Sequence, residues 1–516
     1  MTILNYLFSK DMIRSFRVMV IPNRNYIPNL LTLYSWVQYL YTILIPRCNL
    51  LFHFYMLYAI INKSKLEEVY PMIEKIPFRR HLSSFQIIIL SFAGVILFGA
   101  LILMLPISSA AGIVTPFHSA IFTSTSAVCV TGLVVLDTGS YWSPLGQAVI
   151  LLLIQIGGLG VVTAAVSFAM LAGRKISLMQ RSTMQDAISA PRLGGIVRLT
   201  RFVLRGTLLI ELIGALCMLP SFYGEYGASG IWKAVFHSVS AFCNAGFDIL
   251  GTGAHIYPSL TEYMGNPSVN IAIMLLIIVG GIGFLTWDDI CLHKHHFRRY
   301  CMQSKIVLFT SALLIAIPAA FFFFCDFGGL PVGKRIFASL FQSVTTRTAG
   351  FNTADLNAMT GASKAIMTLL MLIGGSPGST AGGMKTTTFA VIILSAVSVI
   401  KRKEEICVCG RRIDNTIVRN ALAIATIYFS LFFVGGVAIS VLENLPLSDC
   451  LYETASAIGT VGLTLGITPK LGIASQIILI LLMYLGRVGG LTLVYAAIAS
   501  KNQGGAKLPL EKITVG

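Results

Sequence analysis

Four short segments of this sequence carry a glycine within a run of mostly small side chains, each opened by a serine or threonine. They are Ser126-Ala-Val-Cys-Val-Thr-Gly132-Leu, Ser240-Ala-Phe-Cys-Asn-Ala-Gly246-Phe, Thr345-Thr-Arg-Thr-Ala-Gly350-Phe and Ser456-Ala-Ile-Gly-Thr-Val-Gly462-Leu. Backbone carbonyls can replace the hydration shell of an ion, and glycine reaches backbone conformations that cost other residues more. No segment places an aspartate or glutamate beside its glycine. Carbonyls rather than carboxylates would then select the ion, which favours potassium over divalent cations.

The residues expected to coordinate the ion are the glycine and the two residues before it in each segment: Val130, Thr131, Gly132, Asn244, Ala245, Gly246, Thr348, Ala349, Gly350, Thr460, Val461 and Gly462. For any single segment, a small-residue packing site between membrane helices is an equally good interpretation. The four glycines recur roughly every 110 residues, which is too long a period for a solenoid repeat. Four segments in register, each followed by a long apolar stretch, argue against packing sites alone.

Each segment must be held by the same elements: a long apolar helix, a short amphipathic helix, the glycine loop and a second long helix. The short helices, such as residues 117–126 and 451–457, cannot cross a bilayer core of about 30 Å. We expect half-spanning helices whose partially negative carboxyl ends face the cation. Irregular backbone at membrane depth is tolerated only beside protein or water, so the loops should converge on one aqueous pore.

The predicted fold is therefore an all-α integral membrane protein, with four helix, pore-loop, helix repeats in a pseudo-fourfold arrangement around one ion pore. The repeats are expected at residues 84–173, 196–292, 303–400 and 417–501, with a cytoplasmic tail at 502–516.

Composition supports a multi-pass protein of the cell membrane. Hydrophobic side chains make up 55% of the 516 residues and charged ones 11%, and the mean hydropathy is +0.80. The net charge of +17 does not indicate nucleic-acid binding, because the basic residues lie between apolar stretches rather than on one soluble face. By the positive-inside rule, the three basic segments at residues 174–201, 294–305 and 401–419 are cytoplasmic.

The ten cysteines are scattered and suggest no disulfide framework. Cys407 and Cys409, together with His293, His295 and His296, raise the possibility of a metal site, but a solvated loop is the favoured interpretation because no second cysteine pair is present. The N-terminus lacks the pattern of a cleavable signal peptide.

Each second helix contains a glycine-rich break at a corresponding depth: Gly157-Gly158-Leu-Gly160, Gly280-Gly281-Ile-Gly283, Gly374 to Gly383, and Gly486-Arg487-Val-Gly489-Gly490. The third break is expanded and contains a proline, so it cannot continue a helix. We expect an intramembrane loop that can block the pore and move aside: Gly374, Gly375, Ser376, Pro377, Gly378, Ser379, Thr380, Ala381, Gly382 and Gly383. The segment also resembles a phosphate-binding loop, but Met384 separates Lys385 from the last glycine and no soluble strand precedes it, which argues against nucleotide binding.

Charged residues inside the apolar segments are expected to be functional. Arg487 should lie below the filter, bind carbonyls of the Gly374–Gly383 loop and act with it as a gate; a structural salt bridge or a snorkelling side chain is the alternative. Arg347 should brace the third loop through a carboxylate, with Glu453 as the candidate partner. Glu211 could pair across repeats, and its partner is left open.

These segments, above all Thr345-Thr-Arg-Thr-Ala-Gly-Phe-Asn352, resemble those of the Trk/Ktr/HKT superfamily of potassium transporters from about Ser84 onward. The C-terminal Glu511-Lys-Ile-Thr-Val-Gly516 is similar to the ending of the Ktr membrane subunit. The resemblance implies four repeats around one pore, an intramembrane gating loop at Gly374–Gly383 and potassium selectivity wherever the first filter keeps its glycine, here Gly132. A serine at that position accompanies sodium-permeable relatives.

The resemblance further implies an ion-conducting uptake subunit rather than an enzyme. It would act as a homodimer in membrane lipid, bound on its cytoplasmic face by a soluble nucleotide-binding regulatory subunit of the RCK type. Potassium would be the transported ion, with sodium left open as a coupling or activating ion. The alternatives are the potassium-binding subunit of an ATP-driven pump, a sodium-permeable cation transporter, and a secondary transporter for an organic solute, which usually has two repeats.

Residues 1–83 form an atypical extension. Its two apolar patches, residues 30–45 and 50–61, are short for membrane spans. Translation from Met72 is a further hypothesis for this region.

Overall fold

The computed structural model describes residues 83–171, 176–188, 195–253, 255–403 and 405–489. The chain divides into two units, Met1–His81 and Leu82–Gly516, and the described residues belong to the second. The N-terminal extension with its two apolar patches, and the tail at 502–516, lie outside the described residues.

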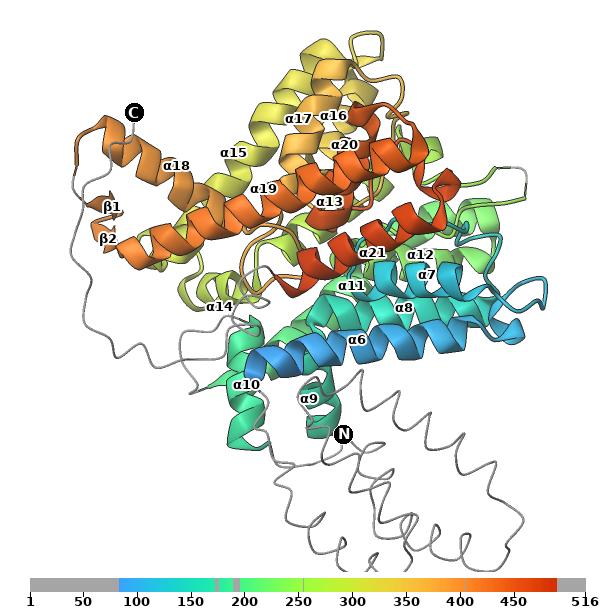
Figure 1. The fold of residues 1–516 in the computed structure, drawn as a ribbon, viewed down its shortest axis with the longest axis horizontal. Coiled ribbons are helices and arrows are strands. Elements are labelled where there is room, and N and C mark those ends of the chain that lie inside the picture. Colours follow the sequence, from blue (N-terminus) through green and yellow to red (C-terminus); the bar gives the residue numbers. More distant parts are fainter. Residues whose placement is uncertain (1–82, 172–175, 189–194, 254, 404, 490–516) are drawn as a thin grey trace, which may run out of the picture. The chain divides into compact units, whose positions relative to one another are not determined.

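Four long apolar helices each open a similar succession of elements (Figure 1). They are α6 (Ser84–Leu103), α11 (Ile196–Tyr226), α15 (Met302–Cys325) and α19 (Asn415–Glu443). In the described part of the chain these four are long and apolar enough to cross a membrane. No more than a third of each apolar window is buried within the described protein, so most of these side chains are left free to contact lipid.

A short helix follows each long one and packs against it. The four short helices are α7 (Phe117–Val128), α12 (Ser229–Phe242), α16 (Val332–Thr345) and α20 (Leu447–Gly459). Pro116, Pro331 and Pro446 stand at the N-caps of three of them, with φ angles of −56°, −56° and −55° that the proline ring fixes. At about 1.5 Å per residue none of them can span a bilayer.

The second helices are interrupted where the glycines predicted a break. α8 (Pro144–Leu159) meets α9 (Val161–Leu171) at a bend of 100°, and α13 (Pro267–Gly281) meets α14 (Phe284–His293) at 97°. The bends occur at Gly160 and Gly283, whose φ angles of +85° and +92° are readily adopted only by glycine. In the third repeat α17 (Gly361–Leu372) and α18 (Thr386–Ile400) flank a loop, and α21 (Ile473–Val488) ends at Gly489, with φ +92°.

Contacts between repeats close a ring. α8 packs on α12, α13 on α16, α17 on α20, and α21 on α7, so that the fourth repeat adjoins the first. Figure 1 shows α21 beside α7 and α6 accordingly. The smaller elements are α10 (Leu178–Ile188) and the 3₁₀ turns Pro106–Ser108, Thr261–Tyr263, Phe297–Arg299 and Thr468–Lys470.

The all-α prediction requires one correction. β1 (Ile406–Val408) and β2 (Arg411–Ile413) form an antiparallel hairpin between α18 and α19. The turn uses Cys409 and Gly410, both at positive φ, which is the geometry of a tight hairpin. Ile406 and Ile413 pack on Val391 and Val418, which gives the hairpin a small core of its own.

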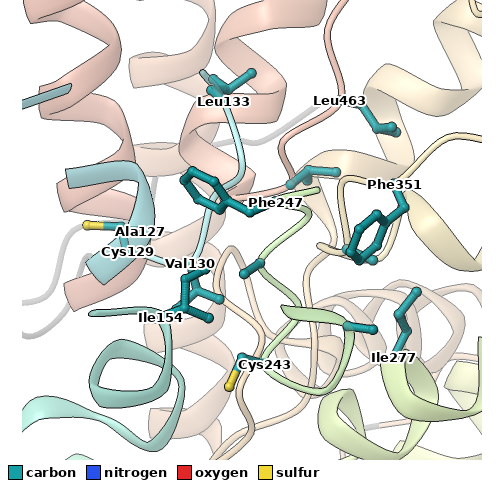
Figure 2. Close-up of a cluster of buried hydrophobic side chains, with 14 of the residues drawn as sticks. Ala127, Cys129, Val130, Leu133, Ile154, Cys243, Phe247, Ile277, Phe351 and Leu463 are labelled. Atoms are coloured by element: carbon teal, nitrogen blue, oxygen red, sulfur yellow. The ribbon is translucent and has the colours of Figure 1, made fainter. Parts of the chain in front are cut away.

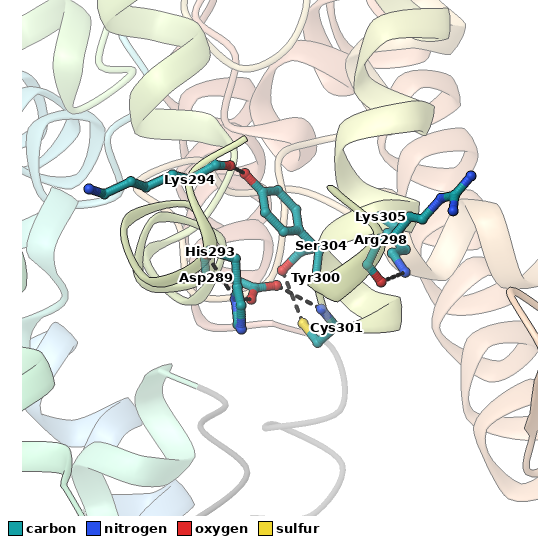
Figure 3. A network of polar contacts seen from close by, with 8 residues as sticks. All are labelled: Asp289, His293, Lys294, Arg298, Tyr300, Cys301, Ser304 and Lys305. Carbon is teal, nitrogen blue, oxygen red and sulfur yellow. Dashed lines mark hydrogen bonds and ion pairs between the residues drawn. The ribbon is translucent and has the colours of Figure 1, made fainter. Parts of the chain in front are cut away.

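The connection between α14 and α15 is held by a network around one carboxylate (Figure 3). Asp289 accepts a hydrogen bond from the Cys301 N–H. Its other carboxylate oxygen lies 2.8 Å from Nδ1 of His293. Cys301 Sγ lies 3.0 Å from Ser304 Oγ. His293, one of the residues considered for a metal site, is therefore engaged in fixing the turn before α15.

Candidate functional site

The four glycine loops follow the four short helices and share one unusual backbone pattern. In each loop the residue two before the glycine, and the glycine itself, have positive φ. The angles are +56° and +92° at Val130 and Gly132, +58° and +68° at Asn244 and Gly246, +65° and +81° at Thr348 and Gly350, and +50° and +95° at Thr460 and Gly462. Non-glycine residues seldom adopt this region. All four loops therefore share one backbone geometry. Simple small-residue packing sites between helices would not require this.

The four glycines form a closed ring. A Cβ placed on each would lie closer than 3.0 Å to the carbonyl oxygen of the residue before the glycine in the next loop. The pairs are Gly132 with Ala245, Gly246 with Ala349, Gly350 with Val461, and Gly462 with Thr131. These contacts therefore run from the first loop through the second and third to the fourth, and from the fourth back to the first. All twelve residues predicted to coordinate the ion belong to these four loops, which the structure brings together.

A serine or threonine at the end of each short helix fixes each loop. The backbone N–H of Thr131 donates to the Ser126 carbonyl at 2.8 Å, and Ala245, Ala349 and Val461 donate in the same way to Ser240, Thr345 and Ser456. In the first and fourth loops the serine Oγ also accepts from the glycine N–H at 3.0 Å. In the second loop Ser240 Oγ donates to the carbonyl of Phe247. These carbonyls and hydroxyls together satisfy the backbone groups of the chain as it leaves the helix.

The residues that follow the glycines belong to the hydrophobic core around the loops (Figure 2). They are Leu133, Phe247, Phe351 and Leu463, and each has an exposed fraction of 1% or less. Figure 2 shows them near one another, with Val130 and Cys243 of the first two loops. Tight packing restrains the loops from opening.

Residues 374–385 form an irregular loop that lies against the second and fourth glycine loops. Thr380 Oγ1 donates to the Phe242 carbonyl at 3.1 Å and lies 3.2 Å from Asn244 Oδ1. A Cβ on Gly382 would collide with Thr460 of the fourth loop. Further backbone bonds tie the loop to the break in the second repeat, including Ser376 N–H to the Gly281 carbonyl at 3.0 Å and Phe284 N–H to the Gly378 carbonyl at 2.7 Å. The loop is therefore held by the second and fourth repeats, as well as its own.

Arg487 joins three repeats. Its Nη1 donates to the Thr380 carbonyl, and its Nη2 donates to the carbonyls of Gly157 and, at 3.2 Å, Gly158. These are carbonyls of the 374–385 loop and of the α8 break. The expected contact between Arg487 and the loop is confirmed, and its bond to the first repeat is an addition.

The predicted partner of Arg347 is wrong. Glu453 accepts from Thr464 Oγ1 at 2.5 Å, the Leu465 N–H at 3.1 Å and Thr468 Oγ1 at 2.6 Å, all in the loop of its own repeat. Those local donors satisfy the carboxylate, so it needs no arginine. Among the described residues Arg347 has no ion-pair partner, and its buried Nε has no hydrogen bond.

Glu211 does pair across repeats. Its Oε2 accepts from Gln155 Nε2 of α8 at 3.4 Å, and Gln155 Oε1 accepts from Cys243 Sγ at 3.5 Å. Cys243 ends the short helix that precedes the second glycine loop. The chain of contacts thus links a buried carboxylate to that loop.

Two acidic residues that the sequence analysis did not single out join the ends of helices. Asp326, at the end of α15, accepts from the Thr360 N–H at 2.9 Å, where α17 begins. Glu443, at the end of α19, accepts from the Gly472 N–H at 2.8 Å and Ser475 Oγ at 2.5 Å, where α21 begins. A carboxylate at a helix N-terminus satisfies free N–H groups and the helix dipole. In the sequence, the signal that could have identified these residues was an acidic side chain at the end of the first long helix of a repeat.

We expect Glu443→Ala to lower the free energy of unfolding by about 1 to 2 kcal/mol, because two hydrogen bonds to a charged acceptor are lost. Thermal unfolding of the detergent-purified chain measures this. Glu262→Ala is the matched control, since Glu262 is exposed in the Thr261–Tyr263 turn. Equal melting temperatures for the two variants would contradict a fastening role for Glu443.

Comparison with known proteins identifies relatives of this chain. The family model for TrkH, described as a cation transport protein, matches residues 51–506. The chain is 38% identical over 450 residues to the potassium/sodium uptake protein NtpJ of Enterococcus hirae, covering 85% of this chain and 98% of that protein. It is also 38% identical over 439 residues to the Ktr system potassium uptake protein B of Bacillus subtilis, covering 84% and 96%.

The fold is shared with the crystal structure of the potassium transporter TrkH from Vibrio parahaemolyticus, with a TM-score of 0.65 at 18% identity, covering 82% of this chain and 86% of that one. The family match begins at residue 51, so the expectation that the resemblance starts near Ser84 was too narrow. The chain is a multi-pass membrane transporter and not an enzyme, and it belongs to the TrkH family of cation transport proteins.

Proposed function

We propose that this chain conducts potassium into the cell through one pore formed by four repeats in pseudo-fourfold arrangement. The closed ring of four glycines, each against a carbonyl of the next loop, is the observation that carries the proposal. Carbonyls repeated around an axis provide the ligands that replace water around a potassium ion. The four short helices end at this ring, so the partially negative ends of their dipoles favour a cation there.

The 374–385 loop and Arg487 form the gate in this proposal. The loop lies against the second and fourth filters, and Arg487 fixes it to the first repeat. A guanidinium close to the conduction path also opposes the passage of cations. Opening requires the loop to leave these carbonyl bonds.

Among the described residues, the connections between repeats hold only α10, the Phe297–Arg299 turn and the β1–β2 hairpin, so we expect the energy of opening to come from a bound partner. We propose a soluble nucleotide-binding regulatory subunit as that partner, and a homodimer as the membrane unit. One relative is named as part of a Ktr system, which supports a multi-subunit assembly. Copurification of the chain with a regulator encoded beside its gene tests this part.

Sodium permeation is the second candidate, because one relative is named a potassium/sodium uptake protein. Glycine at the first filter favours potassium in this chain. We expect Gly132→Ser to reduce discrimination of potassium over sodium by about tenfold, equivalent to about 1.4 kcal/mol. The added side chain would meet the Ala245 carbonyl and so distort the ring.

Rescue of a potassium-uptake-deficient bacterium at low potassium, with sodium competition, measures this selectivity. Gly112→Ser is the matched control, since Gly112 also has positive φ, +67°, but no atom lies within 4 Å of its Cβ position. Unchanged selectivity in Gly132→Ser would contradict the filter role. Failure of the unmodified chain to rescue, even with a cognate regulator, would contradict the transport assignment.

A further inference from the structure

A groove of about 490 Å³ lies along the N-terminal part of α11. Its lining consists of Arg198, Arg201, Phe202, Arg205, Gly206 and Leu209. The three arginines are spaced at i, i+3 and i+7, so they form one stripe on the helix. All three are exposed. Trp287 of α14 packs where Gly206 has no side chain, with its ring 3.3 Å from the Cβ position.

The three guanidinium groups have no partner among the described residues. Within the described ranges, no hydrogen bond or ion pair reaches any of them. Two other arginines do have partners: Arg412 pairs with Glu405 at 2.8 Å, and Arg335 donates to the Phe323 carbonyl at 2.7 Å. Like charges on one helical stripe repel one another. An anion would remove that cost.

The position of the stripe along α11 indicates the source of the anion. Residues 206–224, between Arg205 and the next exposed acid, would span about 28 Å as a helix, close to the thickness of a bilayer core. Arg205 then lies at the hydrocarbon boundary, with Arg201 and Arg198 about 6 and 10 Å beyond it. The positive-inside rule places this end in the cytoplasm. Leu208 and Leu209, 56% and 58% exposed, continue the stripe into the apolar layer.

We infer that this groove binds an anionic phospholipid of the cytoplasmic leaflet, preferably one with two phosphates. Guanidinium groups bind phosphate oxygens through charge-assisted, often bidentate hydrogen bonds. The stripe extends about 10 Å along the helix axis, so two phosphates engage all three arginines, whereas one phosphate engages two. An acyl chain lies along Phe202 and Leu209. Basic pockets on the cytoplasmic side of membrane helices recognise lipids in this way.

The test uses the purified full chain and measures lipid binding by native mass spectrometry and by the shift in melting temperature. The probes are tetraoleoyl cardiolipin, dioleoyl phosphatidylglycerol, dioleoyl phosphatidylcholine and inorganic pyrophosphate. We expect the order of affinity to be cardiolipin, then phosphatidylglycerol, with the other two at background. The variant R198Q/R201Q/R205Q should bind cardiolipin at least tenfold more weakly.

The matched control is K401Q/R402Q/R411Q, which removes the same charge from exposed residues near the hairpin, and it should lose less than twofold. Arg201→Gln alone should weaken binding about threefold, which keeps the test decisive if the triple variant does not fold. Equal cardiolipin affinity in the stripe variants and the control would overturn the proposal. So would protection by pyrophosphate or phosphatidylcholine equal to that by cardiolipin. Transport is not measured, so the result is independent of the proposed function.

Discussion

Replacing Gly350 by alanine is expected to abolish potassium uptake, reducing it to a few per cent of the unmodified chain at equal expression. Gly350 has a φ of +81°, and its Cβ position lies 2.5 Å from the Val461 carbonyl oxygen and 3.0 Å from the Gly246 Cα. A non-glycine residue in this region costs about 1 to 2 kcal/mol by itself. The collision is the larger effect, because the obstructing atom is backbone in a closely packed ring and cannot rotate away.

The matched control separates backbone strain from collision. Gly466 has a similar φ of +87°, and no atom lies within 4 Å of its Cβ position. Gly466→Ala should therefore retain most of the uptake. Rubidium uptake in a potassium-uptake-deficient strain, normalised to membrane expression, compares the two variants. Uptake by Gly350→Ala at more than half of the control value would contradict a tightly closed filter ring.

The ring itself could be predicted only in part from the sequence. The repeated segments, the short helices and the glycine breaks follow from residue type and spacing, and the structure contains all of them. The order of contacts around the ring could not be derived, because it depends on which repeat packs on which. The sequence also could not predict the positive φ of Val130, Asn244, Thr348 and Thr460. Their side-chain types share nothing that indicates a left-handed backbone.

The buried charges show where sequence reasoning fails. Arg487 could be assigned to carbonyls of the third break because four breaks at one depth must meet near the axis. The pairing of Arg347 with Glu453 was predicted wrongly because Glu453 is satisfied by local donors. These donors lie 11 to 15 residues after Glu453, in a loop without a distinctive sequence pattern. The hairpin at Ile406–Ile413 was missed because three-residue strands are too short for an alternating pattern to emerge.

Replacing Arg487 by methionine is expected to raise potassium uptake several-fold when the regulatory subunit is absent. The side chain donates to the carbonyls of Thr380, Gly157 and Gly158. A hydrogen bond from a charged group is worth about 1.5 to 3 kcal/mol, so losing these bonds shifts the 374–385 loop toward its displaced position. Methionine also removes the positive charge that opposes cations in the conduction path.

Arg487→Lys distinguishes the two contributions. Lysine keeps the charge, but its single ammonium group cannot hold the loop and the α8 break in the directed geometry of a guanidinium. Its uptake without the regulator should lie between those of the unmodified chain and Arg487→Met. Equal uptake by the lysine variant and the unmodified chain would show that the positive charge alone keeps the pore closed. A loss of uptake in Arg487→Met, with the chain still folded in the membrane, would instead show that Arg487 supports the open pore, because removing a gate restraint cannot lower conduction.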